Sequence, residues 1–542
     1  MKTLWDALQA AAREAARQAC IVVPPNPARG YWPQGIEWTY GEVCERVSGL
    51  AARYAGRGWG HGHRVAVLLE NRPEFMLHML ALNALGAMVV PINPDYRRDD
   101  LAFLLQQAQP DLVVAIAARA AWLREIAAPI DPGLAVVEEP AFDAALPRAR
   151  RAAAPGTPSI DTAAVLLYTS GTTGMPKGCL IGNDYFFFAA ERYLGAGGLM
   201  RVEHGAERLY NPLPLFYANS LTISNPAMIL SRNAMIFPDR FHPASWWREI
   251  IDSGATMIHY LGVIPPVLLA APPSPLEREH SVRFGVGAGI DPAQRDAFER
   301  RFGIRIVEVW GMSEVGIATA ANVEPRPAGR SIGRPLPGLL MRAVDDDDQP
   351  VGPGQPGELV LRRDGPEPRS GLFQRYHRDE ETTARCWRNG WFHTGDVVQL
   401  EADGTFTFLD RKKHMIRRSG QNIAAAEVEA CLRGHDAVAQ VAVVPVLDEL
   451  REQEVLAVVV PRQPVDDPRA AAERLFEYAA PRLAYFKVPG WAIFVDTLPT
   501  TATQKLQKFT LFDGDADPRQ RPGMIDLRPL KQALTKRRGE LP

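Results

Sequence analysis

The chain has 542 residues, of which 46% are hydrophobic and 23% are charged, and its formal net charge is −2. This length exceeds what one hydrophobic core usually organises, so we expect two or more domains. The charge balance excludes the basic surplus typical of nucleic-acid binding, and the sequence contains no apolar run of about 18 residues that would predict a transmembrane helix.

Residues 1–18 show the pattern of an amphipathic helix and lack the uninterrupted apolar stretch of a signal peptide. Further along, apolar runs at 64–70, 87–93 and 111–117 predict strands, and residues 72–86 and 97–109 predict the helices between them. This alternation is typical of βαβ units around a parallel sheet. A similar alternation of predicted strands and a helix occurs at 233–262. The predicted fold class is α/β, a large N-terminal domain with mixed or parallel sheets covered by helices.

Two stretches have the composition of linkers, Leu146–Ser159 and the basic run Asp410–Gly420. A solvated charge run explains the second equally well on composition alone. After it the pattern restarts with a predicted helix at 424–435 and strands at 438–446 and 455–461. We therefore predict a domain at 1–410, a hinge at 411–413 and a small mobile α+β domain at 414–542.

The five cysteines are scattered and form no C-x-x-C pair, which predicts neither a zinc site nor a disulfide framework. A reducing cytoplasm fits this composition best.

A glycine- and hydroxyl-rich loop, YTSGTTGMPKG, follows the apolar residues 163–167. Backbone N–H groups of such a loop can converge on an anion, the hydroxyls add donors and Lys177 adds a positive charge, so the loop suits a polyphosphate. Its spacing does not match the Walker pattern. A flexible surface loop remains the alternative on these residues alone.

The same loop closely resembles the phosphate-loop signature of the adenylate-forming superfamily, which includes acyl-CoA synthetases, peptide-synthetase adenylation domains and luciferases. Further resemblances follow in order along most of the chain: VWGMSE at 309–314, GELVLR at 357–362, WFHTGD at 391–396, FLDRKKHMIRRSGQNIAAAEVE at 408–429 and LPTTATQKLQK at 498–508. The resemblance implies an acyl-CoA ligase. Such an enzyme activates a small-molecule carboxylic acid as acyl-AMP and transfers the acyl group to coenzyme A, using ATP and Mg²⁺.

The resemblance also implies roles for individual residues. Lys505, Glu314 and Thr169 are expected to be catalytic, with Glu314 and Thr169 holding the metal. The expected ATP-binding residues are Ser170, Gly171, Thr172, Thr173, Gly174, Lys177, Gly287, Ala288, Trp310, Gly311, Ser313, Asp396, Phe408 and Arg411. The expected acyl-pocket residues are Tyr217, Ala218, Asn219, Gly289 and Met312. Ser419 and Gly420 are expected to contact coenzyme A, and Lys413 is the expected hinge residue.

The chain departs from the family pattern at Trp310, where Tyr is usual, at Tyr217, where His is frequent, and at Gln504, where Gly is common. Local likeness around 259–275 and 372–387 points toward carnitine or crotonobetaine-CoA ligases. Tyr217 and Trp310 could face a trimethylammonium group, and they would equally line a pocket for an apolar acid.

Two alternatives to a CoA ligase stay open. One is a stand-alone enzyme that loads a carrier protein, and the other is a catalytically silent nucleotide-binding homologue. We expect no nucleic-acid partner and allow for a homodimer.

Overall fold

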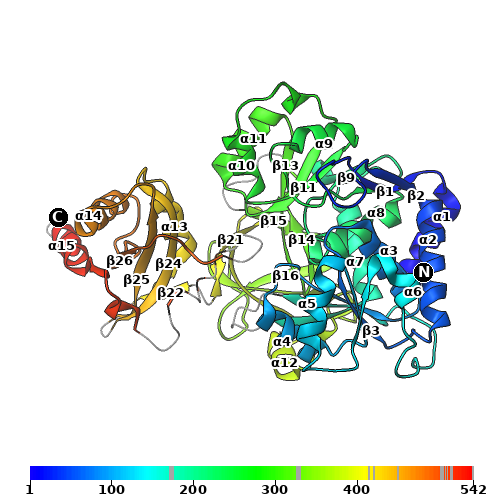
Figure 1. Cartoon of the computed structure of the whole chain (residues 1–542). Coiled ribbons are helices and arrows are strands. Elements are labelled where there is room, and N and C mark those ends of the chain that lie inside the picture. The colour runs from blue at the N-terminus through cyan, green and yellow to red at the C-terminus, as the bar shows by residue number, and fades with distance from the viewer. Residues whose placement is uncertain are drawn as a thin grey trace. The chain divides into compact units, whose positions relative to one another are not determined.

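The computed structural model describes residues 1–169, 176–324, 331–412, 415–418, 421–448, 451–500, 506, 508, 511–512 and 517–539 (Figure 1). The chain forms two compact units. The large unit comprises Met1–Met341, Leu361–Phe392 and Gly404–Phe406, and the small unit comprises Arg342–Val360, His393–Asp403 and Thr407–Pro542. The expected α/β fold class, with a large N-terminal and a small C-terminal domain, is confirmed. The hinge predicted at 411–413 stays a prediction, and Lys413 lies outside the described residues.

The first sheet of the large unit has the strand order β2-β1-β10-β9-β11-β12-β13-β14-β15. Its strands are β1 (Ala19–Val23), β2 (Ile36–Thr39), β9 (Arg208–Tyr210), β10 (Ala234–Ile236), β11 (Met257–Leu261), β12 (Phe284–Ala288), β13 (Arg305–Met312), β14 (Gly316–Ala321) and β15 (Ser331–Pro335). The run from β1 to β13 is parallel, whereas β2, β14 and β15 pair antiparallel. Because parallel strands end at one edge, the segments that follow β11, β12 and β13 lie side by side.

The second sheet of the large unit has the strand order β18-β8-β7-β4-β3-β5-β6. Its strands are β3 (Arg64–Leu68), β4 (Met88–Pro91), β5 (Leu112–Ala115), β6 (Ala135–Glu138), β7 (Ala163–Thr169), β8 (Lys177–Gly182) and β18 (Arg375–Tyr376). The connecting helices α3 (Pro73–Ala84) and α4 (Arg98–Ala108) confirm the βαβ units that the sequence predicts. The strands β3, β4 and β5 are almost wholly buried, which explains their continuous apolar character.

The N-terminal helix α1 (Leu4–Ala15) is amphipathic as predicted. Thr3 and Asp6 form a capping box at its start, and Leu4, Leu8 and Ala11 lie on its buried face. The remaining helices of the large unit are α2 (Tyr40–Gly56), α5 (Ala117–Ala127), α6 (Phe142–Ala145), α7 (Asn183–Gly195), α8 (Asn225–Ser231), α9 (Trp246–Asp252), α10 (Ile264–Ala270), α11 (Pro292–Phe302) and α12 (Glu380–Cys386).

The stretch 146–159 does not separate two domains, because residues on both sides of it belong to the large unit. It is fastened along its length by a hydrogen bond between Arg150 and Asp131 of 3.0 Å and by another of 2.8 Å between Arg151 and Asp111. The prediction of a linker here was wrong, because a Pro- and Gly-rich segment that is bound to the surface of one domain has the same composition as a linker between two domains.

The small unit has a sheet with the strand order β23-β22-β25-β26-β27, and β24 pairs with β25. Its elements are β22 (Met415–Arg418), β23 (Gln421–Ala424), α13 (Ala425–Arg433), β24 (Val438–Asp448), β25 (Glu452–Pro461), α14 (Pro468–Ala479), β26 (Trp491–Phe494), β27 (Ile525–Asp526) and α15 (Arg528–Gly539). The strands β16 (Leu339–Val344), β17 (Pro356–Arg363), β20 (Trp391–Leu400), with β19 (Trp387–Arg388) paired to it, and β21 (Phe406–Arg411) precede them in the chain. Helices α13 and α14 pack on an apolar cluster that includes Val443, Val459 and Phe476.

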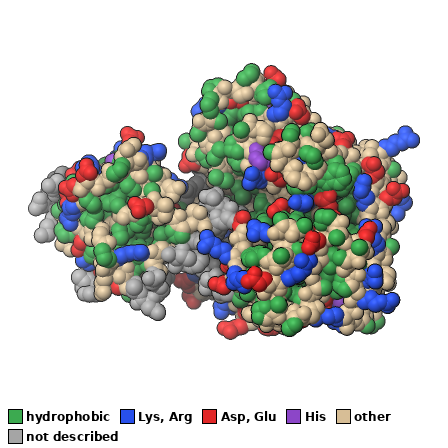
Figure 2. Space-filling model, in the orientation of Figure 1, with side chains coloured by type: hydrophobic (Ala, Val, Ile, Leu, Met, Phe, Trp, Pro, Cys, Tyr) green, Lys and Arg blue, Asp and Glu red, His purple; other side chains and the backbone are tan. Residues whose placement is uncertain are grey.

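Acidic and basic side chains are interspersed on the face of the molecule that Figure 2 shows. Among the described residues, no helix combines the length and the apolar character that crossing a bilayer requires.

Candidate functional site

The hairpin β7–β8 holds both ends of the glycine-rich loop. Tyr168 pairs with Gly178 and Thr169 pairs with Lys177, and the Thr169 hydroxyl donates to the Lys177 carbonyl at 3.4 Å. The loop residues between them, Ser170, Gly171, Thr172, Thr173 and Gly174, lie outside the described part of the chain. The expected phosphate loop is therefore anchored at its two ends by a buried strand pair.

Glu314 lies in the tight turn between β13 and β14 and is buried, with 6% of its surface exposed. The Tyr376 hydroxyl donates to Glu314 Oε1 at 2.7 Å. Tyr376 reaches this position because β18 pairs antiparallel with β8, which places Tyr376 opposite Cys179. Burial, and next the Glu314 carboxylate, raise the pKa of Tyr376 well above its usual range, so the phenol stays a donor.

Three of the predicted residues come together around Cys179. The thiol of Cys179 is within hydrogen-bonding reach of both Glu314 and Thr169, and burial raises its pKa well above the usual range. The Lys177 ammonium lies 5.4 Å from the centre of the Tyr376 ring. One carboxylate, one hydroxyl and one ammonium thus share a small region at the start of β8. That this region binds a polyphosphate stays a prediction.

This donor set fits Mg²⁺ carried by a nucleotide. The described residues contain no group of three or more His, Cys, Asp or Glu side chains that could hold a metal. Mg²⁺ is commonly bound by one or two protein oxygens together with substrate phosphates and water. Glu314 and Thr169 would be the residues that hold it.

The residues that flank Glu314 continue from β13. Trp310 is buried with 7% of its surface exposed and pairs with Ala320 of β14. The Ser313 carbonyl accepts a hydrogen bond of 3.0 Å from the hydroxyl of Tyr185, which fixes the backbone next to Glu314. Gly311 and Met312 are half-buried at the end of β13. That Trp310 stacks on adenine stays a prediction.

The end of β12 and the first residue after it are three small residues with different packing. A Cβ atom on Gly287 would approach the Tyr260 carbonyl to 2.3 Å, so packing within the sheet already requires glycine there. Ala288 ends the strand. Gly289 has φ +83° and open space where its Cβ would be, which fits the expectation that a ligand approaches this backbone.

Glu308 was not among the predicted residues, yet it anchors this loop. Its Oε1 accepts a hydrogen bond of 2.5 Å from the Gly289 N–H, and its Oε2 accepts one of 2.9 Å from the Tyr260 hydroxyl. Burial raises the pKa of Glu308 to about 7, although these two donors oppose the shift. Its place two residues before Trp310 is the signal that could have identified it.

We expect Glu308→Gln to remove a pH dependence from the stability of the large unit. The folded protein keeps the Glu308 proton up to about pH 7, whereas the unfolded chain releases it near pH 4.5. The unfolded state therefore binds fewer protons between these values, and the free energy of unfolding falls as pH rises, by about 3 kcal/mol at most.

Urea unfolding at pH 5 and pH 8 measures this effect. The difference in stability between the Gln variant and the wild type should shift in favour of the variant at the higher pH. Equal changes in both proteins would contradict the assignment.

The segment expected to line the acyl pocket follows β9. The Tyr217 hydroxyl accepts a hydrogen bond of 3.3 Å from the Asn93 amide, and Ala218 is buried. The Asn219 side-chain oxygen accepts from the Asn211 amide at 3.1 Å and lies 2.8 Å from the His259 ring nitrogen. Asn219 also begins a π-helical turn, Asn219–Ser224, a feature frequent at functional sites. The Asn219 amide is thus held in a buried network, and its contact with an acyl group stays a prediction.

His259 is the centre of that network. Its other ring nitrogen lies 2.7 Å from the Tyr193 hydroxyl, and burial lowers its pKa to about 3, so the ring is neutral. A neutral histidine with a partner at each ring nitrogen holds the Asn219 side chain in place, which is a structural role.

Of the predicted residues in the small unit, the structure describes Asp396, Phe408 and Arg411. Arg411 Nε forms an ion pair of 2.6 Å with Asp396, which is almost fully buried, so the two residues expected to bind ribose or phosphate are already adjacent. Phe408 lies three residues before Arg411 on β21 and is half-buried. Ser419, Gly420 and Lys505 lie outside the described residues.

A second ion-pair group of the small unit was not predicted. Lys412 Nζ lies 2.9 Å from Asp346 and 3.1 Å from Glu358, which also lies 3.4 Å from the His393 ring. Burial opposes the ionisation of Glu358, but His393 and Lys412 outweigh it and lower the pKa of Glu358 to about 2. These ion pairs hold Lys412, the residue that precedes the predicted hinge position Lys413.

Comparison with known proteins finds similarity along nearly the whole chain. The family model described as AMP-binding enzyme matches residues 8–376, and the model of the AMP-binding enzyme C-terminal domain matches residues 427–505. A sulfoacetate–CoA ligase from Cupriavidus necator is 32% identical over 88% of this chain and 93% of its own. A crotonobetaine/carnitine–CoA ligase from Salmonella paratyphi A is 28% identical over the same shares.

Solved structures share the fold. ATP-bound MatB from Rhodopseudomonas palustris superposes with a TM-score of 0.79 at 24% identity, covering 94% of this chain and 98% of that one. The o-succinylbenzoate CoA synthetase of Bacillus subtilis, solved with its acyl-adenylate intermediate, gives a TM-score of 0.78 at 23% identity with the same coverage.

Proposed function

Because the chain belongs to the family of AMP-binding enzymes, we propose that Glu314, Thr169 and Lys177 hold the triphosphate of ATP with its Mg²⁺ during acid activation. The enzyme is an ATP-dependent acyl-CoA ligase of the AMP-forming type. A carboxylate attacks the α-phosphorus of ATP, pyrophosphate leaves, and an acyl-adenylate forms. The thiol of coenzyme A then attacks the acyl carbon, and AMP leaves.

The observation that carries this role is the placement of Glu314. Two anions must approach each other in the first step, so positive charge and hydrogen-bond donors are needed to offset their repulsion. Lys177 supplies one such charge, and bound Mg²⁺ supplies Lewis-acid stabilisation of the phosphates. Tyr376 donates to one oxygen of the Glu314 carboxylate and thereby fixes its orientation.

The Asp396–Arg411 pair is proposed to bind the ribose. A carboxylate can accept hydrogen bonds from two hydroxyl groups, and the adjacent Arg411 guanidinium orients the Asp396 carboxylate. Lys505 is proposed to assist the reacting carboxylate, and Gly420 to contact coenzyme A, on the strength of the motifs alone.

We propose a small polar carboxylic acid as the substrate. The Tyr217 hydroxyl and the Asn93 amide present polar groups at the segment expected to face the acid. Two relatives, named for sulfoacetate and for crotonobetaine or carnitine, act on small charged acids.

Pyrophosphate release with Mg-ATP tests the function. The panel comprises sulfoacetate, carnitine, crotonobetaine, dicarboxylates, aromatic acids and fatty acids of increasing length, each with and without coenzyme A. We expect strong CoA-dependent turnover with one small polar acid. Turnover only with long fatty acids would overturn the substrate proposal. Release that coenzyme A does not accelerate would favour a carrier-protein acceptor, and no release with any acid would favour the silent homologue.

Two narrower proposals concern assembly and location. We propose a cytoplasmic enzyme that forms a homodimer, which light scattering coupled to size-exclusion chromatography and cell fractionation would test.

A further inference from the structure

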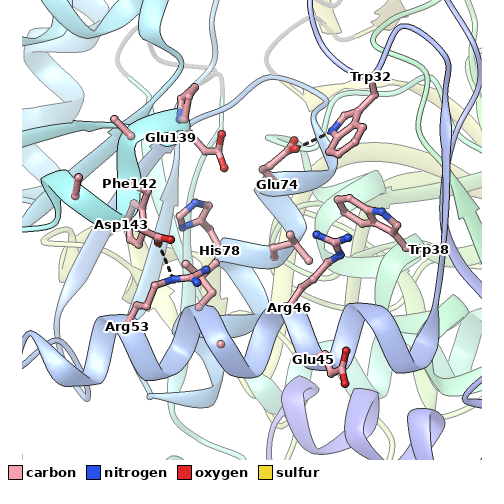
Figure 3. A pocket seen from close by; sticks show the side chains of 16 residues that line it. Trp32, Trp38, Glu45, Arg46, Arg53, Glu74, His78, Glu139, Phe142 and Asp143 are labelled. Carbon is pink, nitrogen blue, oxygen red and sulfur yellow. Dashed lines mark hydrogen bonds and ion pairs between the residues drawn. The ribbon is translucent and has the colours of Figure 1, made fainter.

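The large unit contains a pocket of about 700 Å³ that none of the predicted site residues lines. Helices α2 and α3 form its floor, residues 139–144 form one wall, and Trp32 and Trp38 form the opposite wall (Figure 3). This volume is within the range of small-molecule sites in proteins.

The aromatic wall is held in an unusual conformation. Trp32 has φ +43°, a conformation that residues other than glycine rarely adopt, and it is one of the few large apolar residues that are exposed in the described part of the chain. The Arg29 guanidinium donates to the Trp32 carbonyl at 2.8 Å, and the Trp32 indole donates to Glu74 at 2.8 Å. The Trp38 ring lies edge-on to it at 5.5 Å. Strain of this kind persists only where the surroundings enforce it, and it concentrates at binding sites.

Two carboxyl groups line the pocket between its two walls: that of Glu139 points toward the side of Glu74, and that of Glu74 points toward Trp32 (Figure 3). Glu74 Oε1 accepts a hydrogen bond from the Trp32 indole, whereas its buried Oε2 has no hydrogen-bond partner among the described residues. Burial raises the pKa of Glu139 to about 7; Glu74 and Asp143 add to the shift, and Arg72 opposes it. The positive charge near Glu139 is therefore too small to offset the cost of burying its ionised form.

The two cations of the lining already contact other lining residues. Arg53 forms an ion pair of 2.8 Å with Asp143, and the Arg46 guanidinium lies 4.3 Å from the centre of the Trp38 ring. The lining holds four carboxyl groups, those of Glu45, Glu74, Glu139 and Asp143, against these two guanidinium groups. An anionic ligand would face this surplus of negative charge, whereas a cation would reduce it.

We propose that this pocket binds an organic cation, an ammonium or guanidinium group on an apolar or aromatic body. The charged group lies between Glu74 and Glu139, and the body packs against Trp32 and Phe142. The aromatic faces attract the cation, and the two carboxylates accept its hydrogen bonds. This proposal does not depend on the identity of the acid that the enzyme activates.

Calorimetric titration of the full chain with phenethylammonium tests the proposal, with 2-phenylethanol as the neutral analogue of the same size. We expect one phenethylammonium per chain, bound at least about tenfold more tightly than the alcohol. Equal binding of the two compounds, or no saturable binding of phenethylammonium, would overturn the proposal.

Variants separate the pocket from non-specific binding. Glu139→Gln and Glu74→Gln should each weaken phenethylammonium binding about tenfold. Both keep the side-chain shape, and the amide oxygen introduced by Glu74→Gln can still accept the hydrogen bond from the Trp32 indole. Glu125→Gln is the matched control. Glu125 lies on α5 and forms an exposed ion pair with Arg98 of α4, so this variant should bind phenethylammonium as the wild type does. Unchanged affinity in both pocket variants would overturn the assignment.

Proton release gives a readout that a purely structural role would not change. At pH 6 Glu139 is mostly protonated, so binding of a cation should release nearly one proton per ligand, which titration in two buffers of different ionisation enthalpy measures. Affinity should also increase between pH 6 and pH 8 as Glu139 ionises. Glu139→Gln should lose both effects, and their persistence in this variant would contradict the role of Glu139.

Discussion

If Glu314 holds the Mg²⁺ of ATP as we propose, Glu314→Gln should lower the rate of pyrophosphate release by about 10²–10³-fold, because several kcal/mol of charge stabilisation at the phosphates would be lost. The amide keeps the shape of the side chain and can still accept the hydrogen bond from the Tyr376 hydroxyl. The protein should therefore remain folded, with a melting temperature close to that of the wild type. The concentration of Mg²⁺ needed for half-maximal rate should rise in parallel with the loss of rate.

Tyr376→Phe is the matched variant for this experiment. It removes the hydrogen bond to Glu314 and leaves the carboxylate charge, so we expect a smaller loss of about 10-fold to 100-fold. If Glu314→Gln retained the wild-type rate and Mg²⁺ dependence, the role of Glu314 as metal holder would be wrong. If Tyr376→Phe lost more activity than Glu314→Gln, Tyr376 itself would be the more important group.

We expect Glu454→Ala to destabilise the small unit by about 3–5 kcal/mol. Glu454 is fully buried, and its two oxygens accept hydrogen bonds from Arg418 at 2.8 Å and from Lys531 at 2.7 Å. Its removal leaves two buried cations without their carboxylate. Lys531 belongs to α15, so we expect this helix to detach first. Hydrogen exchange of the amides of β25 and α15 measures the loss.

Glu473→Ala is the control for this prediction. Glu473 forms an ion pair of 2.6 Å with Arg469 on the exposed face of α14, and such surface pairs contribute less than about 1 kcal/mol. Replacing Arg418, Glu454 and Lys531 together with Met should recover much of the stability, because no buried charge is then left unpaired. If Glu454→Ala were as stable as Glu473→Ala, the prediction would be wrong. Water would then stabilise the charges of Arg418 and Lys531 in place of the Glu454 carboxylate.

The order of helices and strands could be predicted from the sequence because it depends on local periodicity. The buried strand β3 is a continuous apolar run, and α1 has a capping box and one apolar face, both visible within a dozen residues. The segment 146–159 is not the linker that its composition predicts. Composition cannot distinguish a linker from a segment that is hydrogen-bonded to distant residues such as Asp131 and Asp111.

The sequence by itself determined which chemical groups are available: a glycine- and hydroxyl-rich loop followed by Lys177, a carboxylate at Glu314 and an aspartate at Asp396, in the order of one enzyme family. Only the tertiary structure decided which groups meet. Tyr376 is 62 residues from Glu314 along the chain and Tyr260 is 48 residues from Glu308, yet each pair shares a hydrogen bond. The pKa of a buried carboxyl group depends on such distant neighbours and on the loss of water around it. No local pattern of residues contains that information.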